Sequence, residues 1–381
     1  MSTTTTTPSA LGPLIRLRGL RTSQLPAPDA PSPAELAPLL RAILQEALPF
    51  IDSAAPKAGS GSGSDGVPGN TQQGWRRRGA HRHTDSAAEV EVLERVVRGK
   101  ELERALVQEG DEKGAGEEEK GKEKGTGKGK GKVRDETWCC RRSLHADKPE
   151  KGTASWAEFV RSFRDEHAET ERAFTPACVG AWRAWAWDCG GVNITTTTTT
   201  AQTQVSEGEG GGGETWGRFS LVVEEMRHRI GRPVLRDRTF PVLQMTATRI
   251  SGGEGEGEGG EEEEEEEFVV VSIPVPDFGD SEMSQLAREK DAQVARYVSV
   301  ERIRRIKDRD GDGDGDGGKV EWLMATASDA GGVLPAWVQN MAAPGVIWKD
   351  VPLFLGWIAK ERGKRQGKEA GTGSGTGSRT G

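Results

Sequence analysis

Six tracts of biased composition interrupt this chain of 381 residues, and they limit how much of it can form a hydrophobic core. A segment without apolar residues gains too little from burial to offset the entropy of ordering, so we expect each tract to be solvated and disordered. The remainder, roughly 200 residues, is enough for one sizeable core. The tracts are a Gly/Ser stretch near Gly59, Glu112–Lys132, Thr195–Gly213, Gly252–Glu267, Asp308–Gly318 and the tail after Gly363.

These tracts predict one domain with inserted loops rather than several domains. We expect an N-terminal segment at residues 1–52 and a low-complexity linker at 53–133. The folded domain then spans 134–362, with disordered insertions near 190–215, 251–267 and 308–318, and a disordered tail follows at 363–381. Apolar residues at helical spacing predict one helix over Pro33–Ile51 in the N-terminal segment and another over Ser86–Gln108 in the linker.

Charge and cysteine usage narrow the class of protein. The formal net charge is -8, but Glu261–Glu267 alone contributes seven negative charges, and no basic stretch is interleaved with aromatic residues, so we expect no nucleic-acid partner. The four cysteines show no metal-binding or disulfide-rich spacing, and no apolar run is long enough to span a membrane. We therefore expect a soluble, cytoplasmic protein. The Arg-rich N-terminus keeps a mitochondrial location as the alternative.

The central and C-terminal parts of the chain read as strands followed by a helix. Alternating or continuous apolar residues predict about six or seven strands, without the β–α–β rhythm of a parallel sheet. A helix over Ser155–Arg172 lies between the first two, and a long helix beginning at Leu334, with a kink near Pro344, ends the domain. The predicted strands are Thr137–Asp147, Ala177–Cys189, Phe219–Ile230, Thr239–Ile250, Phe268–Val275, Ala295–Ile306 and Lys319–Ala327.

Several segments carry a resemblance to a known family. The entry to the last helix, Gly331–Trp337, resembles the same region of START lipid-transfer domains. Trp138 with Arg142, the helix around Trp156, and the segment Arg238–Leu243 look like a START-like family of unknown function that is common in fungi. The resemblance implies an α+β helix-grip fold, in which a curved antiparallel sheet is closed by the long C-terminal helix, and binding of a lipid or other hydrophobic molecule.

A sheet face opposed to a helix supplies the candidate ligand-binding residues. Side chains that share such a face can line an apolar cavity, and a few polar groups among them would meet the ligand's head group. For His145 and His228 the alternative is a satisfied core histidine, and for the apolar residues it is solid core packing. The candidates are Arg142, His145, Met226, His228, Trp322, Met324, Thr326, Val351 and Leu355.

No spacing in the sequence indicates catalytic residues, a cofactor or a metal. The Asp310–Glu321 stretch fits a calcium-loop pattern, but the Asp-Gly repeat fits it in several registers, and Glu321 falls in a predicted strand. The sequence favours binding of a hydrophobic small molecule or lipid, with transfer through transient membrane contact. An enzyme of cyclase or hydrolase type that uses the same cavity, and a protein-interaction module with a collapsed cavity, stay open. The sequence does not indicate an oligomeric state.

Overall fold

A computed structural model describes ten segments of the chain. They are residues 12–27, 32–55, 74–103, 133–196, 214–229, 236–250, 267–290, 292–306, 318–329 and 345–372. The predicted start of the last helix at Leu334, its kink at Pro344, and Asp310 of the calcium-like pattern lie outside the described residues.

The described strands form one sheet of eleven strands, and all seven predicted strands are among them. The main order is β1-β2-β3-β11-β10-β8-β7-β6-β4, with β5 paired to β6 and β9 paired to β7. Only the β7–β9 pairing is parallel among these described pairs. The strands are β1 Arg76–His83, β2 Ser86–Val97, β3 Glu136–Ala146, β4 Cys178–Trp187, β5 Ile194–Thr196, β6 Glu214–His228, β7 Arg238–Ile250, β8 Glu267–Pro274, β9 Gln293–Val294, β10 Arg296–Ile306 and β11 Lys319–Asp329.

The predicted helix over Ser86–Gln108 is wrong for most of its described length, because residues 86–97 form β2 between β1 and β3 and only residues 99–103 are helical. Val90 and Val92 point to one face of the sheet, whereas Leu93 and Val97 pack into the core on the other. A strand that is buried on both faces loses the period-two alternation and can imitate helical spacing. The four valines within β2 were the better signal, since β-branched residues favour strands.

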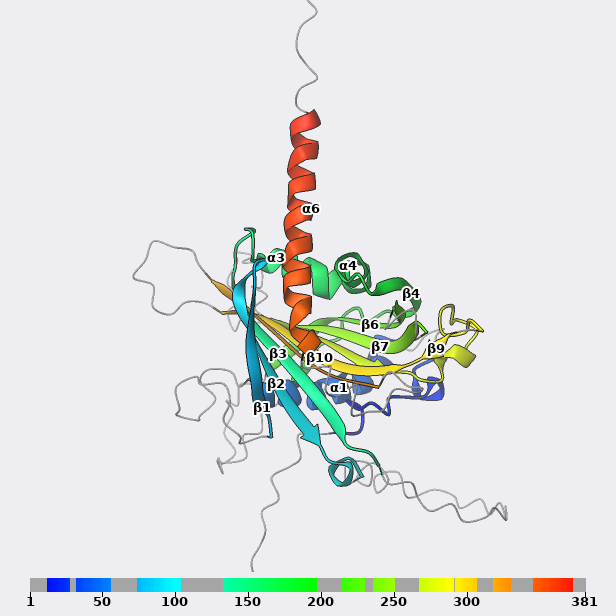
Figure 1. Ribbon diagram of the computed structural model, residues 1–381. Helices are drawn as coiled ribbons and strands as arrows, with labels where there is room; N and C mark the ends of the chain where they lie inside the picture. The colour runs from blue at the N-terminus through cyan, green and yellow to red at the C-terminus, as the bar shows by residue number, and fades with distance from the viewer. Residues whose placement is uncertain are drawn as a thin grey trace, which may run out of the picture.

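The helix predicted at Pro33–Ile51 is confirmed as α1, Pro33–Ala54, which covers one face of the sheet (Figure 1). Pro33 occupies its first turn, and the backbone N–H of Ser32 donates to the Glu35 carboxylate at 2.6 Å, which completes a capping box. Its apolar stripe joins the larger core cluster with residues of β3, β7, β8, β10 and β11. This helix is therefore part of the same core as the sheet.

The face of the sheet opposite α1 carries α3, α4 and α6 (Figure 1). The helix predicted at Ser155–Arg172 consists of three pieces: α3 Trp156–Phe159, a π-helical turn η3 Val160–Asp165, and α4 His167–Phe174. Ser155 caps the first piece, because its side chain accepts from the Glu158 N–H. A single turn η5, Ile347–Lys349, leads into α6, Asp350–Thr372, whose first turns pack beside α4. The predicted α+β fold, an antiparallel sheet with a C-terminal helix over it, is confirmed.

Part of the insertion expected near residues 190–215 is ordered structure. Ile194 is buried and pairs with Trp216, so the short strand β5 continues the sheet beside β6. The Thr run that marks this tract as low-complexity begins inside β5, and threonine is a residue that strands favour. Two short 3-10 helices, η1 Thr22–Gln24 and η4 Phe278–Asp280, lie close together, since Thr22 donates its backbone N–H to Asp277 at 2.9 Å.

Candidate functional site

The face of the sheet below α6 is divided into an aromatic part and a polar part. The aromatic part is closely packed around Trp322. The centroid of its ring lies 4.7 Å from the ring centroid of Phe163 and 5.5 Å from that of Phe354. The predicted residues Val351 and Leu355 belong to this cluster and are fully buried. At this end the protein's own side chains therefore fill the space between sheet and helix.

The polar part contains six ionisable side chains from five different elements, and we call them the inner polar cluster. Strands from the middle of the sheet, the second helix of the α3–α4 pair and the first residue of α6 all contribute, so the cluster exists only in the folded chain. Its members are Arg141 on β3, Glu171 on α4, Glu224 on β6, Tyr297 and Glu301 on β10, and Asp350 on α6.

Arg141 and Glu301 form the best-ordered pair of the cluster. The Arg141 side chain is only 2% exposed, and its Nη2 donates to Glu301 Oε1 at 3.3 Å. The same carboxylate oxygen accepts from Trp322 Nε1 at 2.5 Å. Within the described part of the chain, Nε and Nη1 of Arg141 have no hydrogen-bond partner, although Asp350 Oδ2 lies 3.8 Å from Nε. Buried N–H groups are nearly always satisfied, so two buried donors without an acceptor in the described residues are unusual.

Glu171 is an acid of the cluster with a strongly raised pKa. Burial, together with the negative charges of Asp350, Glu301 and Glu224, raises the pKa of Glu171 to about 8. Burial also raises the pKa of Glu301 and that of Asp350. Nevertheless, 26% of the Glu171 side chain and 36% of the Asp350 side chain remain accessible. Both carboxyl groups are therefore partly accessible, although their surroundings disfavour the charged form.

The two predicted histidines, His145 and His228, lie in different parts of the sheet. His145 is buried in the aromatic part, where its Nε2 lies 2.8 Å from the Ser143 hydroxyl, and burial lowers its pKa to about 3. His228 lies 3.6 Å from Glu171, and burial lowers its pKa to about 4. His145 packs beside Phe159 and Trp322, whereas His228 packs beside Phe240, so these two histidines do not converge.

Arg142 lies on the opposite face of the sheet from the inner polar cluster. It donates to Glu321 at 2.7 Å, and this fully buried carboxylate also accepts from Arg302 and Arg304. Side chains alternate along a strand, so Arg141 and His145 share the face below α6 whereas Arg142 points toward the α1 side. The arginine that meets the site is therefore its sequence neighbour, Arg141.

The other predicted residues lie on the face below α6. Met324 contacts the guanidinium of Arg141, with its sulfur 3.6 Å from Nη2. Met226 packs against Ala168 of α4, close to Glu171 in the same helix. Thr326 is partly buried and donates to the Val298 carbonyl at 3.0 Å. The structure therefore places Met324 and Met226 on either side of the inner polar cluster.

The four acids of the cluster form no sequence motif, because they are far apart in the chain. They are Glu171, Glu224, Glu301 and Asp350. One signal for Glu301 was available. It lies in a strand flanked by Val300 and Arg302, and a strand covered on both faces has no solvent-exposed position for a carboxylate. Glu171 and Asp350 carry no such signal, since each occupies a helix with many charged residues.

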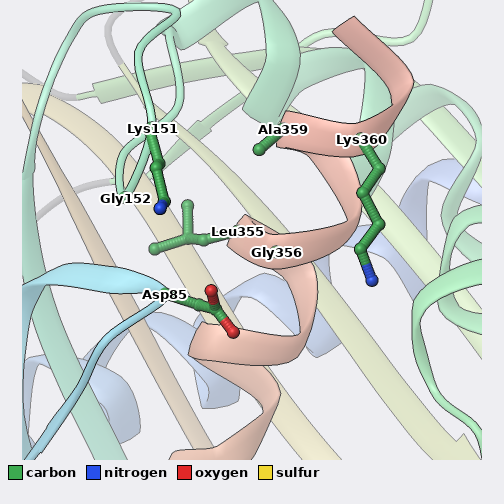
Figure 2. Close-up of a pocket in the computed structure, with 7 residues that line it drawn as sticks. All are labelled: Asp85, Lys151, Gly152, Leu355, Gly356, Ala359 and Lys360. Atoms are coloured by element: carbon green, nitrogen blue, oxygen red, sulfur yellow. The ribbon is translucent and has the colours of Figure 1, made fainter. Parts of the chain in front are cut away.

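A small surface hollow lies between α6 and the loop that follows β3 (Figure 2). Gly356 faces the Asp85 carboxylate across the hollow, and a Cβ at that position would make an ordinary van der Waals contact with it at 3.5 Å. No residue of the inner polar cluster lines the hollow. Its lining is Asp85, Lys151, Gly152, Leu355, Gly356, Ala359 and Lys360.

Two further features of the described residues concern metal binding and membrane spans. In the ten described segments, no group of three His, Cys, Asp or Glu side chains is arranged to hold a metal ion. None of the helices placed by the structure has both the length and the apolar character that crossing a membrane requires.

Comparison with known proteins places the chain in a family. No curated protein matches it. Among solved structures, human STARD10 matches with a TM-score of 0.41 and 12% identity, covering 84% of this chain and 82% of that chain. The lipid transfer and protein localization domain of human StarD13 (DLC2) matches with a TM-score of 0.34 and 12% identity, covering 75% of this chain and 89% of that chain.

The family match covers the sheet from β3 to β11 and the first turns of α6. Residues 138–358, more than half of the chain, match the sequence model of a family described as a protein of unknown function, DUF3074. The family of unknown function that the sequence resembles is thus confirmed. The chain belongs to the DUF3074 family.

Proposed function

We propose that this protein binds a hydrophobic small molecule or lipid on the sheet face below α4 and α6, with the polar end of the ligand at the inner polar cluster. One observation carries the proposal. Arg141 is almost completely buried, and within the described residues two of its nitrogens have no hydrogen-bond partner. A buried guanidinium with unmet donors is costly unless another group completes it.

The residues around the inner polar cluster suit an amphipathic ligand. Met324 touches Arg141 on one side, and on the other Phe240 packs edge-to-face on Tyr297, with ring centroids 5.5 Å apart. Met226 adds a flexible apolar side chain that accommodates varied shapes. Burial of the ligand's apolar surface would drive binding, at about 25 cal/mol per Å² before ordering costs.

Native mass spectrometry of the full chain purified from a eukaryotic host, with organic extraction, tests the proposal. We expect a stoichiometric hydrophobic molecule to co-purify with the protein. A clean apo mass that persists after incubation with mixed liposomes would contradict ligand binding.

A pair of variants locates the site. Met324→Arg places a cation against Arg141 and should abolish ligand retention, whereas Leu144→Arg is the matched control, because Leu144 is exposed on the neighbouring strand. Circular dichroism checks that both variants fold, and Thr326→Arg replaces Met324→Arg if that variant does not. Equal retention by Met324→Arg and Leu144→Arg would place the ligand elsewhere.

A second candidate function is catalysis in the same interior, and the pKa of Glu171 favours it. A carboxyl whose pKa is about 8 is protonated at neutral pH and can act as a general acid. A co-purifying molecule that is converted by the wild-type protein, and not by Glu171→Gln, would support an enzyme over a carrier.

A further inference from the structure

The carboxylates of the inner polar cluster outnumber the cations that balance them. Glu301 is paired with Arg141, and Glu224 accepts from Arg183 at 3.0 Å. Within the described segments, the ion pair of Asp350 is the distant contact of 3.8 Å with Arg141, whose charge Glu301 already shares. The acids of the cluster are therefore only partly neutralised by protein groups.

Among the described residues, Glu171 forms no close ion pair with an arginine or lysine, and Arg141 faces it only at longer range. His228 lies 3.6 Å away and His167 lies 4.0 Å away, but burial lowers the pKa of both histidines to about 4. Both histidines are therefore neutral at neutral pH and cannot stabilise an ionised Glu171. The charged and titratable groups that face Glu171 are Asp350 on α6, Glu301 and Tyr297 on β10, Glu224 and His228 on β6, Arg141 on β3, Cys178 on β4, and His167 on α4 itself.

A ligand at the inner polar cluster would have to supply a hydrogen-bond acceptor for Arg141 and a positive charge for the carboxylates. Nε and Nη1 of Arg141 are buried donors without a partner in the described residues, and Oε2 of Glu224 is a buried acceptor without one. A fatty acid or a phosphate monoester would satisfy Arg141 but would add negative charge beside Glu171 and Asp350. A simple alcohol would supply hydrogen bonds but no positive charge. A head group with an ammonium next to a hydroxyl supplies both.

We propose that the inner polar cluster receives the head group of a long-chain amino alcohol. Its ammonium lies against the carboxylates of Glu171 and Asp350, and its hydroxyl oxygen accepts from Arg141. This inference rests on the proposed function, because the hydrocarbon chain must lie along the apolar side chains of the same sheet face, such as Met226 and Phe240.

Binding of such a cation has a measurable proton signature. Free Glu171 holds a proton at neutral pH, and an adjacent ammonium stabilises the ionised carboxylate. The protein should therefore release about one proton per ligand bound. Octadecanol carries no charge and should release none.

Isothermal titration calorimetry of the full chain with sphinganine, octadecanol and stearic acid tests the inference. Titration at neutral pH in two buffers of different ionisation enthalpy gives the number of protons released. We expect sphinganine to bind about tenfold tighter or more than octadecanol, since a charge-assisted hydrogen bond is involved. Stearic acid should bind most weakly.

Variants separate the inference from the proposed function. Glu171→Gln should weaken sphinganine by about tenfold or more and abolish proton release, without weakening octadecanol. Glu169→Gln, on an exposed position of the same helix, should leave both quantities unchanged. If Glu171→Gln does not fold, Asp350→Asn serves in its place.

The outcomes are distinct. Octadecanol or stearic acid binding as tightly as sphinganine, or sphinganine binding without proton release, would overturn the amino-alcohol inference and leave hydrophobic binding intact. No binding of any of the three probes by folded protein would overturn both.

Discussion

The guanidinium of Arg141 lies over the indole ring of Trp322, 3.9 Å from its centroid, and both side chains donate to the same oxygen of Glu301. The three residues come from β3, β11 and β10, which are adjacent strands in the sheet. This arrangement joins the aromatic part of the face to the inner polar cluster. A substitution of one of these three residues therefore alters the contacts of the other two.

The Arg141–Glu301 pair should show strong thermodynamic coupling. Arg141→Leu leaves the Glu301 carboxylate buried without its cation, and we expect it to lower the free energy of unfolding by about 3–5 kcal/mol. Arg141→Leu combined with Glu301→Leu removes both charges and should cost less than the sum of the single changes. Urea unfolding followed by tryptophan fluorescence measures this. Additive losses would show that the pair is not coupled.

The ionisation of Glu171 should make stability depend on pH. Between 4.5, the ordinary pKa of a glutamic acid, and about 8, the folded protein holds a proton that the unfolded chain has lost. The free energy of unfolding should therefore fall as pH rises through this window. Glu171→Gln removes this contribution, so its stability relative to wild type should increase with pH. The Glu169→Gln control should track the wild type, and an unchanged slope in Glu171→Gln would contradict the assignment.

The cysteines should be unreactive in the folded protein. Cys139, Cys140, Cys178 and Cys189 are all buried, and burial raises the pKa of Cys139 to about 12 and those of Cys178 and Cys189 to about 11. The thiolate is the reactive form, so Ellman's reagent should label almost nothing in buffer and four thiols in urea. Rapid labelling in buffer would show that one of these sites opens.

Two neighbouring arginines should have different roles. Arg142→Met removes one of the three arginines that contact Glu321, and Arg302 and Arg304 remain. We expect the free energy of unfolding to fall by about 1–3 kcal/mol, without an effect on ligand retention. Arg141→Met should abolish ligand retention. Native mass spectrometry and urea unfolding of both variants measure the two effects, and ligand loss in Arg142→Met would show that the α1 side of the sheet takes part in binding.

The sequence predicts most of the fold, because seven strands and α1 have clear apolar periodicity. It fails at β2, where burial on both faces gives Val90, Leu93 and Val97 a helical spacing. Alternation along β3 is visible in the sequence and already separates His145 from Arg142. The inner polar cluster cannot be predicted in this way, since Glu171 and Asp350 come together only when α4 and α6 pack beside each other.

The attachment of α1 to the sheet has a consequence for truncation. Arg302, fully buried in the middle of the sheet, donates to the Asp52 side chain and to the carbonyl of Ala55 at 2.8 Å, at the end of α1. The family match begins only at residue 138, after α1, β1 and β2. A protein shortened to residues 138–358 would expose the apolar face that α1 covers and a new edge at β3, and such surfaces promote aggregation. The unit that folds is thus larger than the unit that the family shares, and expression should begin upstream of Pro33.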